Sequence, residues 1–287
     1  MKIKNISYLI FIIFILFLFS ISINNLNKEN YDNNLYQDSV IPKYFFQIWI
    51  NNENKVPKLI EENFNSIKYE NQDFECKLYK KDDCLDFLQK NYEEDVINAY
   101  NKIIPGAYKA DLMRYCILYK KGGIYLDAKL KPINDFKLNH VTDKEYYVKD
   151  FKFMGGGVTN GFMVCKKNNP KLLKAINEIV KNVKEKYYGK NSLSPTGPLL
   201  LKKVFSEEEI NNFDFEYTTY SNGSDNKLII SKKPNSYESA IFEKAEDLVE
   251  EQTKSRSEKN YGELWNEKKI YEPFQNIFNS NITLFNL

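Results

Sequence analysis

The hydrophobic positions divide the chain into a long apolar N-terminal run and a region of short apolar runs separated by amphipathic segments. Residues 6–23 contain no charged side chain, whereas residues 24–40 are polar and rich in asparagine. From residue 41 onward, runs such as 44–50 are nearly continuously apolar, as expected of a parallel strand covered on both faces. Segments with helical periodicity alternate with these runs, so the pattern predicts an α/β fold with a parallel sheet.

The individual elements follow from the same pattern and from their flanking punctuation. Helices are predicted from Pro57 to about residue 69, from Asp82 or Asp83 to residue 90, over 92–103, and from Pro170 and Pro198 onward. Residues 155–160 are predicted as a loop, and beyond residue 205 only 228–234 and 261–271 show clear patterning. The predicted strands are 44–50, 74–80, 123–130, 145–151 and 161–167.

The segment 107–132 combines these signals with candidate chemistry. Asp111 and Arg114 lie one turn apart on a predicted amphipathic helix, because spacings of three and four residues return to the same helix face. Gly122 and Gly123 supply the positive φ that ends a helix and allows a tight turn. The strand that follows delivers Asp127 near its carboxyl end, where ligands bind in open α/β sheets. The three charged groups are therefore expected to converge on one crevice.

The apolar run 6–23 predicts a membrane segment. As a helix it would span about 27 Å, close to the thickness of a bilayer's hydrocarbon core. An uncleaved signal anchor is favoured over a cleaved signal peptide, and the basic tip 1–5 would then stay cytoplasmic. The chain thus divides into the tip 1–5, the anchor 6–23, a polar stem 24–40 and one domain, 41–287. We expect a type II protein facing the lumen of a Golgi- or ER-like compartment, or else a secreted one.

Composition excludes several classes of function. The 41 basic and 39 acidic residues give a net charge of +2, so nothing draws the chain to nucleic acid. His140 is the only histidine, which excludes a Ser-His-Asp or Cys-His hydrolase. The four cysteines lack metal-ligand spacing. Cys116 and Cys165 are expected to be buried thiols, and a Cys76–Cys84 disulfide stays open.

Two blocks of sequence resemble a known family. AYKADLMRYCILYKKGGIYLDAK (107–129) and IPKYFFQIWI (41–50) resemble glycosyltransferase family 32, the group with a sugar-binding region containing a DXD motif. That group includes initiation-type mannosyltransferases and is distantly similar to clostridial toxin glucosyltransferase domains. The resemblance covers roughly residues 40–205. It implies a GT-A type α/β domain that moves a hexose or hexosamine, with retention, from a nucleotide-sugar donor to a glycan or glycoprotein acceptor.

The resemblance also implies roles for individual residues. Asp111, Arg114 and Asp127 take the catalytic positions, with Arg114 suited to phosphate oxygens and Asp127 as ligand of Mn²⁺ or Mg²⁺. Trp49 is placed to stack on the base of the donor. The other donor-binding positions are Gln47, Tyr125, Lys129, Asn160, Thr196, Gly197 and, on a C-terminal segment that closes over the donor, Trp265.

Two positions depart from the family pattern. Phe46 stands where the family usually has histidine, and Lys129 stands at the second Asp of the Asp-x-Asp motif. An ammonium group cannot ligate a metal ion. Three interpretations therefore stay open: a metal held by Asp127, the diphosphate and a C-terminal ligand; Lys129 itself neutralising the diphosphate; or a catalytically silent module that only binds nucleotide sugars or carbohydrate.

Overall fold

The computed structural model describes residues 13–19, 40–150, 157–222, 225–232, 238–256 and 259–273. Residues 13–19 are helical and exposed. Within the described ranges, no helix is long and apolar enough to cross a membrane. The rest of the predicted anchor 6–23, and nearly all of the predicted stem 24–40, lie outside the described residues.

The first half of the domain forms as the sequence predicts. Strand β1 (Tyr44–Ile48) lies between β2 (Glu75–Tyr79) and β3 (Gly123–Leu126), and both neighbours run parallel to it. Phe45 and Phe46 point to opposite faces of the sheet and join different hydrophobic clusters, so both faces are covered. The helices of this half are α2 (Lys58–Glu70), α3 (Lys81–Asn91), α4 (Glu94–Lys102) and α5 (Gly106–Lys121).

The second half corrects the expectation of a parallel sheet: among the described strands beyond β3, β5 and β7 pair in parallel and the other pairs are antiparallel. Strand β6 (Gly157–Cys165) runs antiparallel to β3, and it includes residues 157–160 of the predicted loop. The sheet has nine strands in the order β2-β1-β3-β6-β5-β7-β8-β9-β4, and from β7 onward neighbouring strands are antiparallel. The remaining strands are β4 (Leu130–Pro132), β5 (Tyr146–Asp150), β7 (Phe215–Asn222), β8 (Asp225–Lys232) and β9 (Ala240–Lys244).

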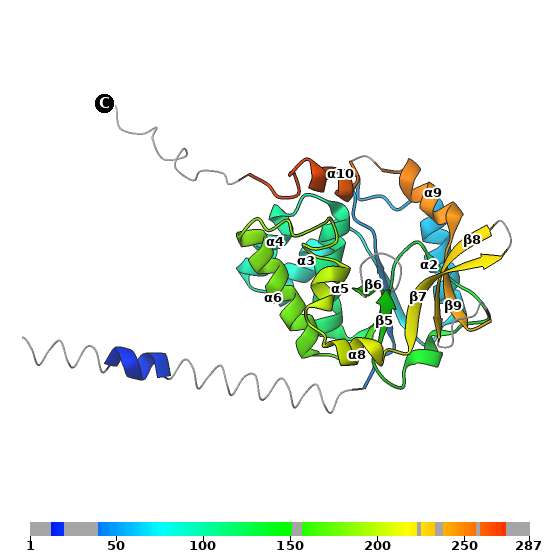
Figure 1. Ribbon diagram of the computed structural model, residues 1–287, viewed down its shortest axis with the longest axis horizontal. Coiled ribbons are helices and arrows are strands. Elements are labelled where there is room, and N and C mark those ends of the chain that lie inside the picture. The colour runs from blue at the N-terminus through cyan, green and yellow to red at the C-terminus, as the bar shows by residue number, and fades with distance from the viewer. Residues whose placement is uncertain are drawn as a thin grey trace, which may run out of the picture.

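Helices cover the sheet on two sides (Figure 1). Helices α3 to α6 gather at one side, while α2 and α9 lie beside the strands of the second half (Figure 1). The later helical elements are η1 (Leu138–Val141), α6 (Pro170–Lys184), α7 (Pro198–Lys202), α8 (Glu207–Asn211), α9 (Glu246–Lys254) and α10 (Tyr261–Asn266).

Helix α5 is buried on all sides from residue 110 to 119, so the prediction of an amphipathic helix is wrong. It packs between strands β1 and β3 on one side and helices α3, α6 and α10 on the other. Gly122 and Gly123 end it with φ of 67° and 96°, as predicted. A Cβ at Gly123 would overlap the carbonyl oxygen of Tyr44, so only glycine lets β3 approach β1.

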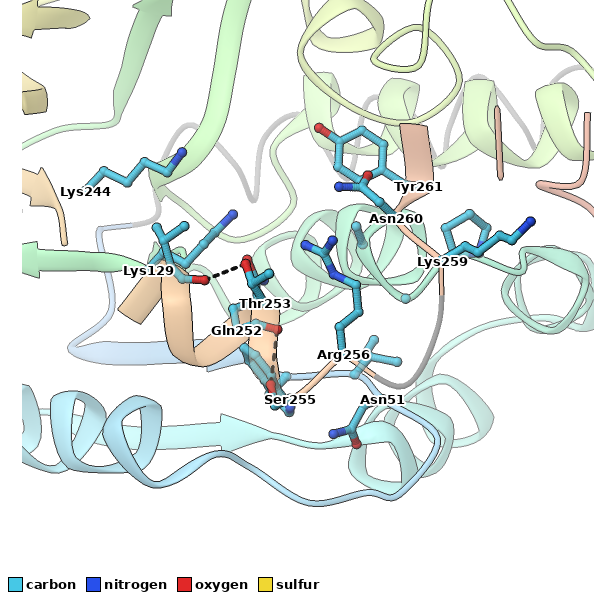
Figure 2. Close-up of a pocket in the computed structure, with 16 residues that line it drawn as sticks. Asn51, Lys129, Lys244, Gln252, Thr253, Ser255, Arg256, Lys259, Asn260 and Tyr261 are labelled. Carbon is cyan, nitrogen blue, oxygen red and sulfur yellow. Dashed lines mark hydrogen bonds between the residues drawn. The ribbon is translucent and has the colours of Figure 1, made fainter. Parts of the chain in front are cut away.

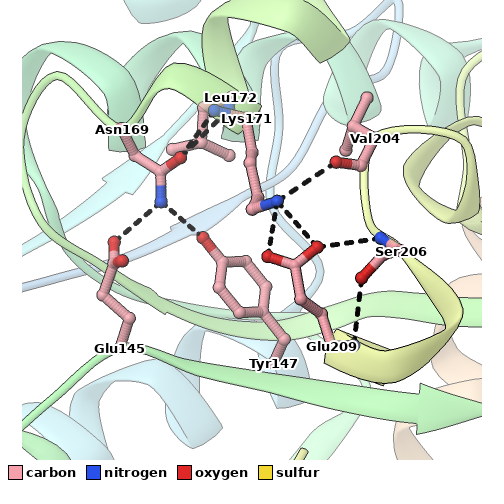
Figure 3. A network of polar contacts seen from close by, with 8 residues as sticks. All are labelled: Glu145, Tyr147, Asn169, Lys171, Leu172, Val204, Ser206 and Glu209. Carbon is pink, nitrogen blue, oxygen red and sulfur yellow. Dashed lines mark hydrogen bonds and ion pairs between the residues drawn. The ribbon is translucent and has the colours of Figure 1, made fainter. Parts of the chain in front are cut away.

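A polar network ties β5 to the helices of the second half (Figure 3). Asn169 caps α6 and donates from Nδ2 to the hydroxyl of Tyr147 at 2.7 Å and to Oε1 of Glu145 at 2.8 Å. Lys171, in the first turn of α6, forms an ion pair with Glu209 of α8 at 2.7 Å. These contacts hold α6 and α8 against the sheet at the end distant from the candidate site.

The cysteines are all free thiols. Cys116 and Cys165 are buried, as predicted. Burial raises the pKa of both thiols, so neither has the character of a reactive thiolate.

Candidate functional site

Arg114 forms the centre of a buried polar cluster on helix α5. Its Nη2 lies 3.1 Å from Oδ1 of Asp111, and its Nη1 donates to the carbonyl oxygen of Asn160 at 2.7 Å. The guanidinium also lies over the ring of Tyr125, 4.5 Å from the ring centroid. A cation held by a carboxylate, a carbonyl and an aromatic face in this way is fixed in position.

Asp111 collects the other members of the cluster. Nδ2 of Asn160 donates to Oδ1 at 2.8 Å, and the hydroxyl of Thr196 donates to Oδ2 at 2.7 Å. Gly197 follows Thr196 next to this carboxylate, and a Cβ there would meet Oδ2 of Asp111 at an ordinary contact distance of 3.4 Å. The structure therefore brings together four residues that the sequence predicted from distant segments: Asp111, Arg114, Asn160 and Thr196. We call these four residues the buried network.

The buried network is closed to solvent. Asp111 is 8% exposed and Arg114 is 5% exposed, and neither lines the two pockets described below. Burial raises the pKa of Asp111, although Arg114, Thr196 and Asn160 act in the opposite direction. Burial alone would lower the pKa of Arg114, but Tyr125, Asp111 and Asp127 outweigh it and raise the pKa above its ordinary value. Arg114 therefore stays charged and senses both carboxylates.

Asp127 lies directly after β3, at the carboxyl end of the strand. Its N–H donates to the carbonyl oxygen of Gly161 at 2.7 Å, and its own carbonyl oxygen accepts from the N–H of Leu130 at 2.9 Å. The second bond closes a tight turn that places Lys129 beside Asp127. Burial would raise the pKa of Asp127, but Lys129 and Arg114 outweigh it, so the pKa is lowered and the group is an anion at neutral pH.

Asp127 lines a small pocket of about 100 Å³, and an open pocket of about 330 Å³ adjoins it. Lys129 and Lys244 line both pockets, so the two pockets adjoin at these side chains. Trp49 and Arg256 also line the open pocket. Figure 2 shows Lys129, Lys244 and Arg256 extending into the same space. We call these three residues the cation cluster.

The register of the sheet explains why Lys244 reaches Lys129. Strand β4 pairs with β9 so that Leu130 lies opposite Lys244, and the N–H of Ala245 donates to the carbonyl oxygen of Lys129 at 3.1 Å. Arg256 follows the C-terminal end of α9, where a cation is favoured by the helix dipole. Neither Lys244 nor Arg256 was predicted, because one basic residue on a polar segment carries no local signal of a binding site.

Trp49 lines the open pocket as expected, and its Nε1 is buried without a hydrogen-bond partner among the described residues. Gln47 is fully buried, and its amide likewise has no partner in the described part of the chain. Gln47, Tyr125, Asn160, Thr196 and Gly197 do not line either pocket. Five of the predicted donor-binding residues therefore lie beneath the site surface.

Trp265 does not line either pocket, and its place over the donor stays a prediction. Its indole donates to the carbonyl oxygen of Tyr188 at 2.7 Å, and Lys268 lies over its ring. Tyr261, at the start of the same helix α10, is the residue that lines the pocket. Helix α10 therefore presents its first residue to the open pocket and its last turn to Tyr188.

The residues of the site do not fit a divalent metal ion held by the protein. Within the described ranges, no group of three or more His, Cys, Asp or Glu side chains could hold a metal. Asp127 is the one carboxylate among the residues that line the two pockets, and Lys129 and Lys244 lie beside it. Mn²⁺ and Mg²⁺ prefer several oxygen ligands, which this arrangement does not provide.

Comparison with known proteins supports the resemblance seen in the sequence. Residues 57–148 match the family described as "Glycosyltransferase sugar-binding region containing DXD motif". An uncharacterized glycosyltransferase, L373, of Acanthamoeba polyphaga mimivirus is 33% identical over 100 residues, which are 34% of this chain and 40% of that protein. Inositol phosphoceramide mannosyltransferase 3 of Schizosaccharomyces pombe is 27% identical over 183 residues, 63% of this chain and 48% of that protein. The chain thus spans less than half the length of each relative.

Solved structures show a weaker likeness. The PaToxG glycosyltransferase aligns with 67% of this chain and 81% of its own, at 18% identity and a TM-score of 0.46. The catalytic domain of alpha-toxin from Clostridium novyi aligns with 78% and 82%, at 10% identity and a TM-score of 0.45. Residues 57–148 are thus similar to a glycosyltransferase family, the one with a sugar-binding region containing a DXD motif.

Proposed function

We propose that this protein is a retaining glycosyltransferase of the GT-A type that moves a hexose or hexosamine from a nucleotide-sugar donor to a glycan or glycoprotein. One observation carries the proposal. The carboxyl ends of the parallel strands β1 and β3 face two adjoining pockets: Trp49 and the cation cluster line the open one, and Asp127 lines the small one beside Lys129 and Lys244. A planar base, a sugar and a diphosphate require these three kinds of group.

The chemistry assigns each group a task. Trp49 offers an aromatic surface to the base, and Asp127 accepts hydrogen bonds from sugar hydroxyls. The bond between the anomeric carbon and the phosphate oxygen breaks, and the acceptor hydroxyl forms the new bond while its proton passes to the departing phosphate. Fixed cations stabilise the charge that develops on the diphosphate. Attack on the face that the diphosphate leaves gives retention without a protein nucleophile.

The buried network has a positioning task in this proposal. Arg114 and Asp111 lie beneath the site and connect α5 to the residues before α7 and to β6. Arg114 also acts on Asp127 through its charge, which helps keep that carboxylate ionised. The network therefore holds the end of β3 and the charge of Asp127 in place.

The proposal includes the predicted N-terminal anchor and a lumen-facing, or secreted, catalytic domain. The support is the uncharged run 6–23 with Lys2 and Lys4 before it. Alkaline extraction of membranes from cells expressing the full chain, with protease protection of the vesicles, tests both points. Release of the chain by alkali, or digestion of the domain in sealed vesicles, would contradict the anchor or its orientation.

A silent module that binds nucleotide sugars is the second candidate, and Lys129 in place of the second Asp favours it. Donor turnover separates the two. The full chain in detergent is incubated with nucleotide sugars of each base and with glycan acceptors. Release of nucleoside diphosphate and labelled product from any donor supports the transferase. Binding of a donor with no release in any condition supports the silent module instead.

A further inference from the structure

We propose that Lys129, Lys244 and Arg256 hold the donor's diphosphate without a divalent metal ion. This inference rests on the proposed function and names the means by which the same site binds phosphate. It reverses the expectation of Mn²⁺ or Mg²⁺ that accompanies the Asp-x-Asp motif. Three observations carry it: the supply of ligands, the geometry of the cations and the charge of the site.

The supply of ligands argues against a bound metal. Asp127 is the single carboxylate lining the two pockets, and the described residues contain no cluster able to hold a metal. An ammonium two residues away repels a divalent cation at the same carboxylate. A metal at Asp127 would therefore have one protein ligand and unfavourable neighbours.

The geometry places the three cations around one space. Lys129 projects from the turn after β3, Lys244 ends β9 directly opposite Leu130, and Arg256 follows α9. Their side chains extend toward a common volume, as Figure 2 shows, and all three line the open pocket. Lys259 behaves differently, since it points away in the same view and pairs with Glu267. The cluster is thus a property of specific positions and not of a generally basic surface.

The charge of the cluster matches what a metal would supply. Exchanging an aspartate for a lysine adds two positive charges to a site at neutral pH, the same change as binding one divalent ion. Lys129 makes this exchange at the position of the family's second Asp. Within the described residues, Arg256 has no carboxylate partner, so its guanidinium offers its donors to a ligand. Guanidinium and ammonium groups bind phosphate oxygens through charge-assisted hydrogen bonds.

Calorimetric titration of the full chain in detergent tests the inference. The probes are UDP, GDP, ADP, CDP and TDP with their monophosphates, each in EDTA and in excess Mn²⁺ or Mg²⁺. We expect at least one diphosphate to bind in EDTA with an affinity within threefold of that in Mn²⁺, and its monophosphate to bind about tenfold more weakly. Binding of a diphosphate only when metal is present would overturn the inference and leave the proposed function intact. Failure of every probe in every condition would overturn both.

Substitutions assign the effect to the cation cluster. We expect Arg256→Gln to weaken diphosphate binding in EDTA about tenfold and to leave monophosphate binding nearly unchanged. Lys254→Gln is the matched control, because Lys254 ends the helix that Arg256 follows, is exposed and pairs with Glu250 at 3.1 Å outside the pocket. Equal losses in both variants would overturn the inference, because general surface charge would then explain the binding.

A second substitution reverses the exchange at residue 129. Lys129→Asp restores the family's paired carboxylates, so we expect diphosphate binding in EDTA to fall about 100-fold and Mn²⁺ to recover at least tenfold of the loss. The midpoint temperature of thermal unfolding is measured for this variant, and a value equal to that of the wild type shows that the variant folds. A variant that binds as tightly as the wild type in EDTA would overturn the role of Lys129.

Discussion

The buried network and the cation cluster lie next to each other and differ in almost every physical respect. In the network, Asp111 accepts from three donors and Arg114 has three acceptors around it, all closed to solvent. In the cluster, Lys129 and Arg256 line an open pocket, and the indole nitrogen of Trp49 is left without a described partner. One region is satisfied by the protein itself, and the other borders an open pocket in which we propose that a ligand binds.

This difference shows that residues matching one family motif can serve two purposes. Asp111 and Arg114 match the motif as well as Asp127 does, yet they lie below the surface on which Asp127 opens. Loss of a network residue should therefore reduce stability first. Loss of a pocket residue should reduce binding or transfer and leave stability nearly unchanged.

The largest expected effect is that of Asp127→Asn. The amide oxygen is a weaker acceptor for the donor's sugar hydroxyls than the carboxylate, so transfer should fall at least about 100-fold. The free energy of unfolding should stay within about 1 kcal/mol of the wild type, because the residue packs at a pocket wall. Initial rates with the preferred donor and urea unfolding provide the two readouts. If Asp127→Asn lost stability as severely as it lost transfer, Asp127 would be a structural residue, and the difference between the two regions would not hold.

Arg114→Met should cost about 3–5 kcal/mol of unfolding free energy, because it leaves the Asp111 carboxylate buried without its cation. Methionine fills a similar volume, so the loss reports the charge and not a cavity. Chemical denaturation of the variant and of Asp111→Asn/Arg114→Met measures it, and the double variant should recover part of the stability. If Arg114→Met had the same free energy of unfolding as the wild type, the ion pair would contribute nothing to folding.

Thr196→Val tests a single hydrogen bond of the network. Valine keeps the shape of threonine but removes the donor to Oδ2 of Asp111, so we expect a loss of about 1.5–3 kcal/mol. The KM for donor should stay within twofold, because Thr196 does not line either pocket. Thr159→Val is a useful counterpart, since Thr159 lines the small pocket. A larger change in KM than in stability for Thr196→Val would place its hydroxyl in the binding site.

The smallest expected effect is in the pH dependence of stability. Asp127 has a lowered pKa in the folded chain, so its ionised form contributes stability above the unfolded pKa of about 4 that is lost as the pH falls further. Asp111 has a raised pKa, so its contribution becomes less favourable as the pH rises above about 4. Unfolding of Asp127→Asn and Asp111→Asn between pH 3 and 7 should thus give opposite trends relative to wild type. If the free energy of unfolding of both variants changed with pH in the same direction relative to wild type, the two carboxylates would not differ as described.

The first half of the fold was predictable because its strands and helices carry strong apolar periodicity and clear punctuation. The strands from β7 to β9 were not, because a sequence such as FEYTTYSN alternates polar residues and acquires its pairing only from neighbouring hairpins. The antiparallel β6 was also hidden, since an apolar strand looks alike in either direction.

The candidate site was predictable at its matched positions and not beyond them. The convergence of Asp111, Arg114, Asn160 and Thr196 follows the predicted segments, but their burial depends on how residues 194–197 pack over α5, which no local pattern encodes. Lys244 and Arg256 enter the site through the β4–β9 register and the end of α9. Pairing between segments that are far apart in the sequence cannot be predicted from the pattern of either segment alone.

The wall of the site is built from two parts of the sequence, and these two parts can be exchanged independently. Lys244 and Arg256 come from beyond residue 148, where the family match ends, whereas Asp127 and Lys129 lie inside it. A strand-and-helix unit of residues 240–256 therefore borders the open pocket while sharing few contacts with helix α5. Exchange of this unit for that of a related protein would offer a route to new donor preference on an unaltered catalytic frame.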